Sequence, residues 1–128
     1  MSLFNGFFDK KNEVPKSTFA WKNLRSIEDL NKAQQDSHIK TVVLFKHSTR
    51  CSISRFVLKN FENTVTIPEE EMDFYFLDLI EYRSVSNEIA ERFNVIHQSP
   101  QLIILKKGEA VYDASHESID AEILNQYL

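Results

Sequence analysis

Short apolar runs alternate along this chain with segments whose apolar residues recur every three or four positions. The run at 41–45 is β-branched and apolar on both faces, which is typical of a central strand covered on both sides. Further strand-like runs lie at 18–21, 73–78 and 101–106, and the helical pattern lies at 26–36, 51–61, 84–93 and 119–128. A tight turn at Lys107 and Gly108 joins 101–106 to a hairpin partner at 109–114. This order predicts crossovers between parallel strands, an antiparallel hairpin at one edge, and an α/β sandwich with helices on both faces of a mixed central sheet.

Length and composition limit the fold and the partners further. A chain of 128 residues suits one domain, which we place at 18–128 after an amino-terminal segment and linker at 1–17. Two Gly and three Pro are too few turn-forming residues for a many-stranded sandwich or barrel. The net charge of −4 disfavours a phosphate-binding surface, so nucleic acid is not an expected partner. No apolar run approaches the roughly 20 residues of a membrane span, and the Phe-rich start lacks the features of a secretion signal.

The single cysteine, Cys51, is the most informative position. One cysteine cannot form an intramolecular disulfide, which favours the thiol-reducing cytoplasm as the setting. Cys51 falls where a strand gives way to a helix, and the amino terminus of a helix favours the thiolate over the thiol. Lys46, His47, Arg50 and Arg55 add positive charge within five residues of it. The pattern therefore predicts a reactive thiol; the alternative is an inert cysteine buried in the core.

Two further positions bear on this chemistry. Ser54 stands three residues after Cys51, where a Cys-x-x-Cys helix would carry its second thiol, so a mechanism with one thiol follows. The Ser54 hydroxyl either donates a hydrogen bond to the thiolate or lies on a solvated helix face. Pro100 precedes the apolar run at 101–106, where it marks either an ordinary strand start or a cis peptide bond.

These residues carry a resemblance to a known family. The order of elements and the run from Ser99 and Pro100 to Gly108 resemble the thioredoxin fold, a three-layer α/β/α sandwich in which a cis-proline, a strand and a glycine turn follow one another. More narrowly, one ten-residue run resembles the signature of the monothiol bacilliredoxins of bacteria: Phe45-Lys46-His47-Ser48-Thr49-Arg50-Cys51-Ser52-Ile53-Ser54. The likeness extends from about residue 19 to residue 128.

The resemblance implies a thiol-disulfide oxidoreductase that removes a low-molecular-weight thiol, bacillithiol in the family, from S-thiolated client proteins. It implies no cofactor beyond that small thiol as co-substrate, and no metal. Cys51 matches the family's nucleophile and Pro100 its cis-proline. If the bond before Pro100 is cis, the backbone of Ser99 faces the site and can pair with a bound substrate. Thr49 and Arg50 are candidate contacts for carboxylate or sugar hydroxyl groups of the small thiol.

Ser52 departs from the family, which commonly has proline directly after the cysteine. Proline at the first helical position lacks an N–H group, so Ser52 leaves one more donor near the sulfur. We therefore expect Ser52 to favour the thiolate.

Three other readings of the sequence remain open. Ser48 and Cys51, with a nearby arginine, partly match the arrangement of a thiol peroxidase, although Leu44 stands where that pattern has proline. His47, Cys51 and His97 would form a metal site if the fold brought them together. A non-catalytic thioredoxin-like binding module, docking a partner through its Phe-rich start, is the third.

Overall fold

A computed structural model describes residues 19–128, so the predictions for the Phe-rich start and the linker lie outside the described part. The described residues form a five-stranded sheet in the order β1-β3-β2-β4-β5. Its strands are β1 (Trp21–Asn23), β2 (Thr41–His47), β3 (Met72–Asp78), β4 (Gln101–Lys106) and β5 (Glu109–Ser115). β3 runs parallel to both β1 and β2, whereas β4 is antiparallel to β2 and to β5. The predicted mixed sheet with a hairpin edge is confirmed.

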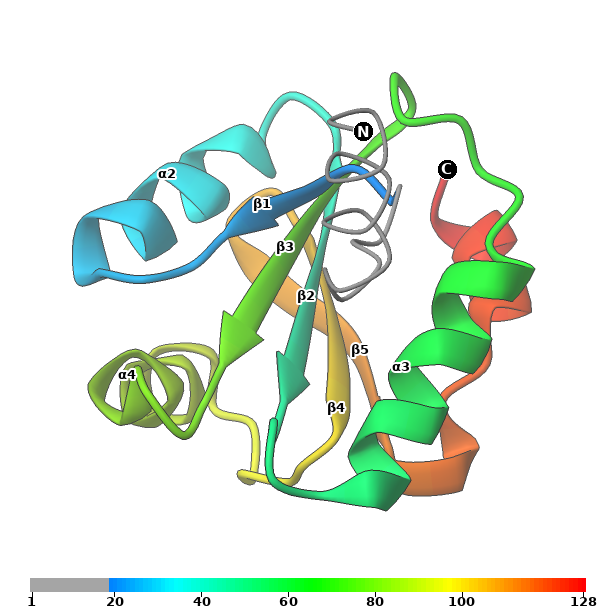
Figure 1. Cartoon of the computed structure of the whole chain (residues 1–128). Coiled ribbons are helices and arrows are strands. Elements are labelled where there is room, and N and C mark those ends of the chain that lie inside the picture. The colour runs from blue at the N-terminus through cyan, green and yellow to red at the C-terminus, as the bar shows by residue number, and fades with distance from the viewer. Residues whose placement is uncertain (1–18) are drawn as a thin grey trace, which may run out of the picture.

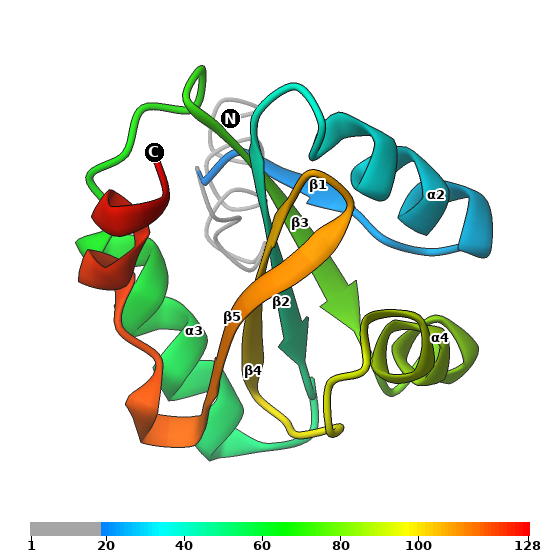
Figure 2. The same cartoon turned by 180° about the vertical axis from the view of Figure 1, so that it is seen from behind.

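Helices cover both faces of this sheet, as Figures 1 and 2 show. One face carries α2 (Ile27–Asp36) and α4 (Arg83–Phe93). The other carries α3 (Ser52–Thr64) and two 3₁₀ segments, η1 (His116–Ser118) and η2 (Ala121–Tyr127). The result is the three-layer α/β/α sandwich of the thioredoxin fold.

The central strands separate two apolar cores. Because side chains alternate along a strand, Leu44 packs toward α2 and α4 while its neighbour Phe45 packs toward α3. The second core is rich in aromatic side chains, with Trp21 in contact with Phe45 at 5.8 Å and with Phe61 at 6.1 Å between ring centroids. β2 is buried along its whole length, in agreement with its prediction as the central strand.

Local signals in the sequence account for several element boundaries. Ser26 caps α2 by accepting a hydrogen bond of 3.0 Å from the Asp29 N–H group, as its position before the helical pattern predicts. Lys107 and Gly108 both have positive φ, the backbone of a two-residue hairpin turn, and they join β4 to β5.

The structure corrects two predicted elements. The strand predicted at 18–21 is displaced, and Trp21–Asn23 pairs instead with Phe74–Phe76 of β3. The carboxyl-terminal helix is of the 3₁₀ type, and its buried residues Ala121 and Leu124 lie one turn of such a helix apart. Between residues 19 and 128, no helix has the length and apolar character needed to cross a membrane.

Candidate active site

Cys51 lies at the junction between the central strand and α3, as predicted. It is the N-cap residue of α3 and has extended backbone, and its side chain is partly exposed. Its N–H group donates to the Ser48 carbonyl over 3.2 Å, and its own carbonyl accepts the first helical hydrogen bond, 3.1 Å from the Arg55 nitrogen. The alternative of a cysteine enclosed in the core is therefore not what the structure shows.

The first turn of α3 presents unpaired donors beside this thiol. Within residues 19–128, the backbone N–H groups of Ser52, Ile53 and Ser54 make no hydrogen bond to the protein. Unpaired N–H groups at the start of a helix carry partial positive charge and stabilise a neighbouring anion. Three such donors therefore stand at the residues that directly follow Cys51.

Ser54 has a different set of partners from the one expected. Its side chain is fully buried, and its Oγ lies 2.8 Å from His47 Nδ1 and accepts a hydrogen bond of 3.2 Å from the Ser48 N–H group. No hydrogen bond joins it to Cys51 in the described structure. Ser54 therefore connects the first turn of α3 to the end of β2, and it fixes the turn that carries Cys51.

The positive cluster predicted around Cys51 is only partly present. Burial lowers the pKa of His47, Arg55 acts in the same direction, and Asp78 and Glu62 oppose them. Arg55 donates from Nη1 to the Thr49 carbonyl over 3.1 Å and stays close to the turn. Lys46 belongs to the opposite face of β2, because successive strand residues point to opposite sides.

Lys46 forms a separate polar network with His97 and Gln101. The residue is fully buried, and its Nζ lies 2.7 Å from His97 Nδ1 and donates to Gln101 Oε1 over 3.0 Å. Burial, with a smaller contribution from Arg83, lowers the pKa of Lys46 to about 8, and burial and Lys46 lower that of His97. The sequence signal for this network is a lysine that continues an otherwise apolar strand, and the prediction missed it by assigning Lys46 to the surroundings of Cys51.

The network holds the segment that precedes β4. Gln101 donates from Nε2 to the Ile96 carbonyl over 3.0 Å and accepts from the Gln98 N–H group over 3.3 Å. Both contacts lie in the stretch that leads into Ser99 and Pro100. The polar groups of Lys46 and Gln101 thereby set the path of the chain beside the end of β2.

The peptide bond between Ser99 and Pro100 is cis, which decides between the two readings of that proline. Pro100 directly precedes Gln101, which lies opposite Lys46 in the pairing of β2 with β4. The segment before β4 and the connection from β2 to α3 lie at the same end of the sheet in both views (Figures 1 and 2). The fold thus brings Ser99 and Pro100 to the end of the sheet that carries Cys51.

The remaining predicted site residues lie around this end. Ser52, Thr49 and Arg50 are exposed next to Cys51 in the chain, and Ser99 is half-buried. The Ser99 Oγ atom is buried and has no hydrogen-bond partner within residues 19–128.

An apolar groove lies along α3, and its first lining residue, Ile53, comes two residues after Cys51. It measures about 270 Å³ and is lined by Ile53, Phe56, Val57, Asn60, His116, Glu117 and Ile119. Ile53 and Phe56 are 65% and 74% exposed, although both are large apolar side chains. His116 closes the groove from the end of β5, and its N–H group donates to the Pro100 carbonyl over 3.0 Å. Exposed apolar side chains concentrated in one place are a mark of a surface for another molecule.

The structure does not assemble the metal site considered from the sequence. His47 pairs with Ser54, and His97 pairs with Lys46 on the other face of β2. Within residues 19–128 there is no group of three or more His, Cys, Asp or Glu side chains arranged to hold a metal ion.

Solved structures share this architecture. A proposed oxidoreductase with a thioredoxin fold is 32% identical, with a TM-score of 0.70, and the match covers 82% of this chain and 90% of that one. The thioredoxin of Malassezia sympodialis is 17% identical, with a TM-score of 0.66 and coverage of 90% and 93%. That of Fasciola hepatica is 19% identical, with a TM-score of 0.61 and coverage of 82% and 93%.

The fold, the thiol at the start of the helix after the central strand and the cis-proline together define a thioredoxin-fold protein with a thiol redox function. The chain departs from a two-cysteine site, because Cys51 is its only cysteine. It belongs to the monothiol bacilliredoxin family: the family model of monothiol bacilliredoxin BrxC matches residues 22–124.

Proposed function

We propose that this protein is a thiol-disulfide oxidoreductase that uses Cys51 alone to remove a low-molecular-weight thiol from S-thiolated client proteins in the cytoplasm. The observation that carries the proposal is the position of the only cysteine, partly exposed at the unpaired N–H groups of α3. The family likeness supports bacillithiol as the small thiol.

The reaction divides into two exchanges of disulfide for thiolate. The Cys51 thiolate attacks the small-thiol sulfur of the client's mixed disulfide, forms a disulfide between Cys51 and the small thiol, and releases the client thiolate. The thiolate of a second small-thiol molecule then attacks the small-thiol sulfur of the disulfide on Cys51. The two small thiols leave together as their symmetrical disulfide, and the Cys51 thiolate is regenerated. Ser54 cannot replace the second thiol, because its side chain is a hydroxyl held by His47 and Ser48.

The apolar groove supports a client protein as the partner in the first exchange. Ile53 and Phe56 lie on α3, two and five residues after its N-cap residue Cys51. The groove and the thiol are therefore carried by the same helix. A client cysteine with neighbouring apolar side chains would bury them in this groove while its disulfide lies at Cys51. Within residues 19–128 the backbone of Ser99 makes no hydrogen bond, so it is available for pairing with the same client.

Mass spectrometry tests the proposal directly. The protein is incubated with bacillithiol disulfide, and with a client protein carrying bacillithiol on one cysteine; Cys51→Ser is the matched control. We expect the mass of one small thiol to be added at Cys51, the client to be released in its free form, and free thiol to remove the adduct. Cys51→Ser gains no mass and releases no client.

An adduct that forms no faster than on a cysteine in a short unstructured peptide would contradict the proposal. The same experiment separates the rival functions. A binding module would retain the client at the apolar groove without discharging it, and Phe56→Ser would then abolish retention. A thiol peroxidase would consume hydrogen peroxide in the presence of a reductant, which an oxidoreductase of the proposed kind does not.

A further inference from the structure

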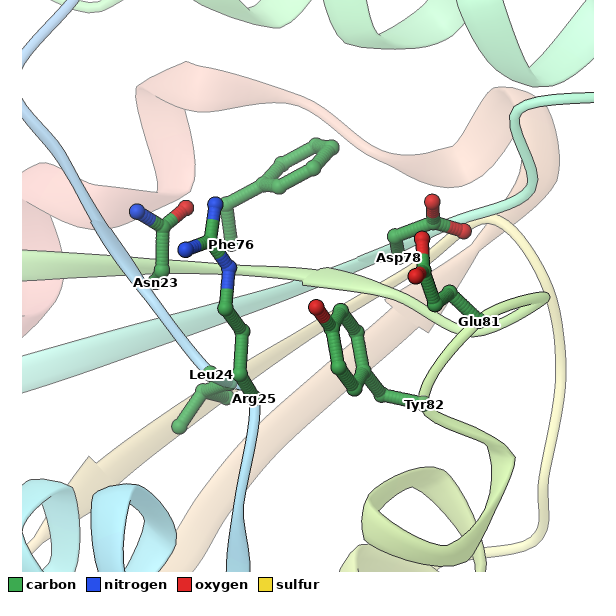
Figure 3. A pocket seen from close by; sticks show the side chains of 7 residues that line it. All are labelled: Asn23, Leu24, Arg25, Phe76, Asp78, Glu81 and Tyr82. Carbon is green, nitrogen blue, oxygen red and sulfur yellow. The ribbon is translucent and has the colours of Figure 1, made fainter.

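A polar pocket lies at the carboxyl ends of β1 and β3 (Figure 3). It measures about 160 Å³ and is lined by Asn23, Leu24, Arg25, Phe76, Asp78, Glu81 and Tyr82. Since one water takes about 30 Å³ of liquid, it has room for about five waters. It therefore accommodates the polar part of a small molecule whose remainder lies outside.

The charges in this pocket are separated by sign. Arg25 and Asn23 lie on one side in Figure 3, Asp78 and Glu81 lie on the other, and the hydroxyl of Tyr82 points between them. An array of this kind complements a zwitterion, with its carboxylate at the arginine and its ammonium at the acids.

Most of these polar groups have no partner in the protein. Within residues 19–128, no hydrogen bond or ion pair involves the side chains of Asn23, Arg25, Glu81 or Tyr82. Asp78 uses one oxygen to accept from the Ile80 N–H group over 3.1 Å. Convergent polar side chains that do not satisfy one another are available to a ligand.

The pocket and the turn that carries Cys51 are connected through His47, the last residue of β2. Asp78 lies opposite His47 in the pairing of β2 with β3, and the ring of Phe76, which lines the pocket, lies 5.5 Å from the ring of His47. Neighbouring strands are about 4.8 Å apart, and the hydrogen bond from Cys51 to Ser48 closes a tight turn. The Cα atoms of Asp78 and Cys51 therefore lie within about 16 Å of each other.

We propose that this pocket binds the charged arm of the small thiol whose sulfur is joined to Cys51, an assignment that rests on the proposed function. A ligand that extends from Cys51 meets Asp78 and Glu81 before it reaches Arg25. The site thus selects a zwitterionic thiol whose ammonium group lies nearer the sulfur than its carboxylate. Tyr82 and Asn23 bind hydroxyl groups between these charges.

The test compares two disulfides that differ in charge. Bacillithiol disulfide carries ammonium and carboxylate groups, whereas the disulfide of 2-mercaptoethanol is neutral; each transfers half of itself to the Cys51 thiolate and leaves as the other thiolate. Mass spectrometry measures the rate of adduct formation with each disulfide. The quantity compared is the rate with bacillithiol disulfide divided by the rate with the disulfide of 2-mercaptoethanol. Arg25→Gln is expected to lower this ratio about tenfold, the scale of one lost charge-assisted hydrogen bond. Glu81→Gln lowers it as well.

Lys59→Gln is the matched control, because it removes one positive charge from an exposed position of α3 that does not line the pocket. It is expected to leave the ratio near its native value. The subsite is wrong if Arg25→Gln leaves the ratio near its native value, or if Lys59→Gln lowers it as much as Arg25→Gln does. If the native protein reacts with neither disulfide, the proposed function itself fails.

Discussion

At the scale of single residues, Ser54 takes no part in the proposed disulfide exchange, but its side chain fixes the turn that carries Cys51. Its place in the sequence identifies Ser54 as the residue that replaces a second thiol. Its role emerges only from the fold, because His47 and Ser48 reach Ser54 across the turn between β2 and α3. A spacing pattern identifies the residue at a position, but it does not show which atoms of other residues will form hydrogen bonds with its side chain.

Replacing Ser54 by Ala should destabilise the protein by about 1–3 kcal/mol, because the Ser48 N–H group and His47 Nδ1 both lose their partner. The measurement is urea unfolding followed by the fluorescence of Trp21, the only tryptophan. Ser52→Ala is the control, since Ser52 is exposed; its effect should stay within about 0.5 kcal/mol. Equal losses in both variants would show that the buried contacts of Ser54 contribute nothing.

Lys46 makes the free energy of unfolding depend on pH, and its lowered pKa fixes the direction of that dependence. The folded protein lowers the pKa of Lys46 from 10.5 to about 8, since burial penalises the charged form. Between these two values the unfolded chain holds a proton that the folded chain has released, so the free energy of unfolding rises with pH across this window.

The comparison with Lys46→Met isolates this effect. Between about pH 7 and pH 9.5, the free energy of unfolding of the native protein should rise by about 2 kcal/mol relative to that of the variant. Urea unfolding at both pH values measures it, and subtracting the variant removes contributions from other groups. A difference that is independent of pH would mean that Lys46 keeps its proton in the folded state.

At the scale of elements, the start of α3 was predictable and the end of the chain was not. Short polar residues followed by a helical pattern predict a helix that begins at Cys51, one residue before the observed start at Ser52, because this signal is local. The apolar positions near the carboxyl terminus fit both an α-helix and a 3₁₀ helix, and the structure packs them on the second core as a 3₁₀ helix. Such a choice depends on tertiary packing, which no local pattern contains.

Ser52→Pro tests the donors at the start of α3. Position 52 is the first residue of the helix, where proline is accepted without loss of a helical hydrogen bond. The change removes one of the unpaired N–H groups beside Cys51, so the fraction of thiolate at neutral pH should fall. The ultraviolet absorbance of the thiolate measures this fraction, with Cys51→Ser as the blank. A proline variant with an equal or larger thiolate absorbance would contradict the role assigned to the Ser52 N–H group.

At the scale of the whole molecule, the sequence predicts the architecture better than the site. The run at 41–45, apolar on both faces, predicts β2 as the central strand, and the run at 101–106 with the glycine turn predicts a hairpin at an edge. The pairing of Lys46 with Gln101 and of His47 with Asp78 needs the register of three strands. That register is a property of the assembled sheet, so the network around Lys46 and the polar pocket could not be derived from spacing.

Because one sheet separates two cores, each core should stabilise the whole fold. Ile103 and Ile104 are consecutive residues of β4, both fully buried, and they contact the α2 and α4 side and the α3 side respectively. Ile103→Val and Ile104→Val each remove one methylene group, so each should cost about 0.5–1.5 kcal/mol. Trp21 lies in the second core, yet its fluorescence and the circular dichroism of the whole chain should report one coincident transition in both variants. Should Ile103→Val shift only the circular dichroism and leave the fluorescence transition in place, the two layers would unfold separately, and the sheet would not couple them.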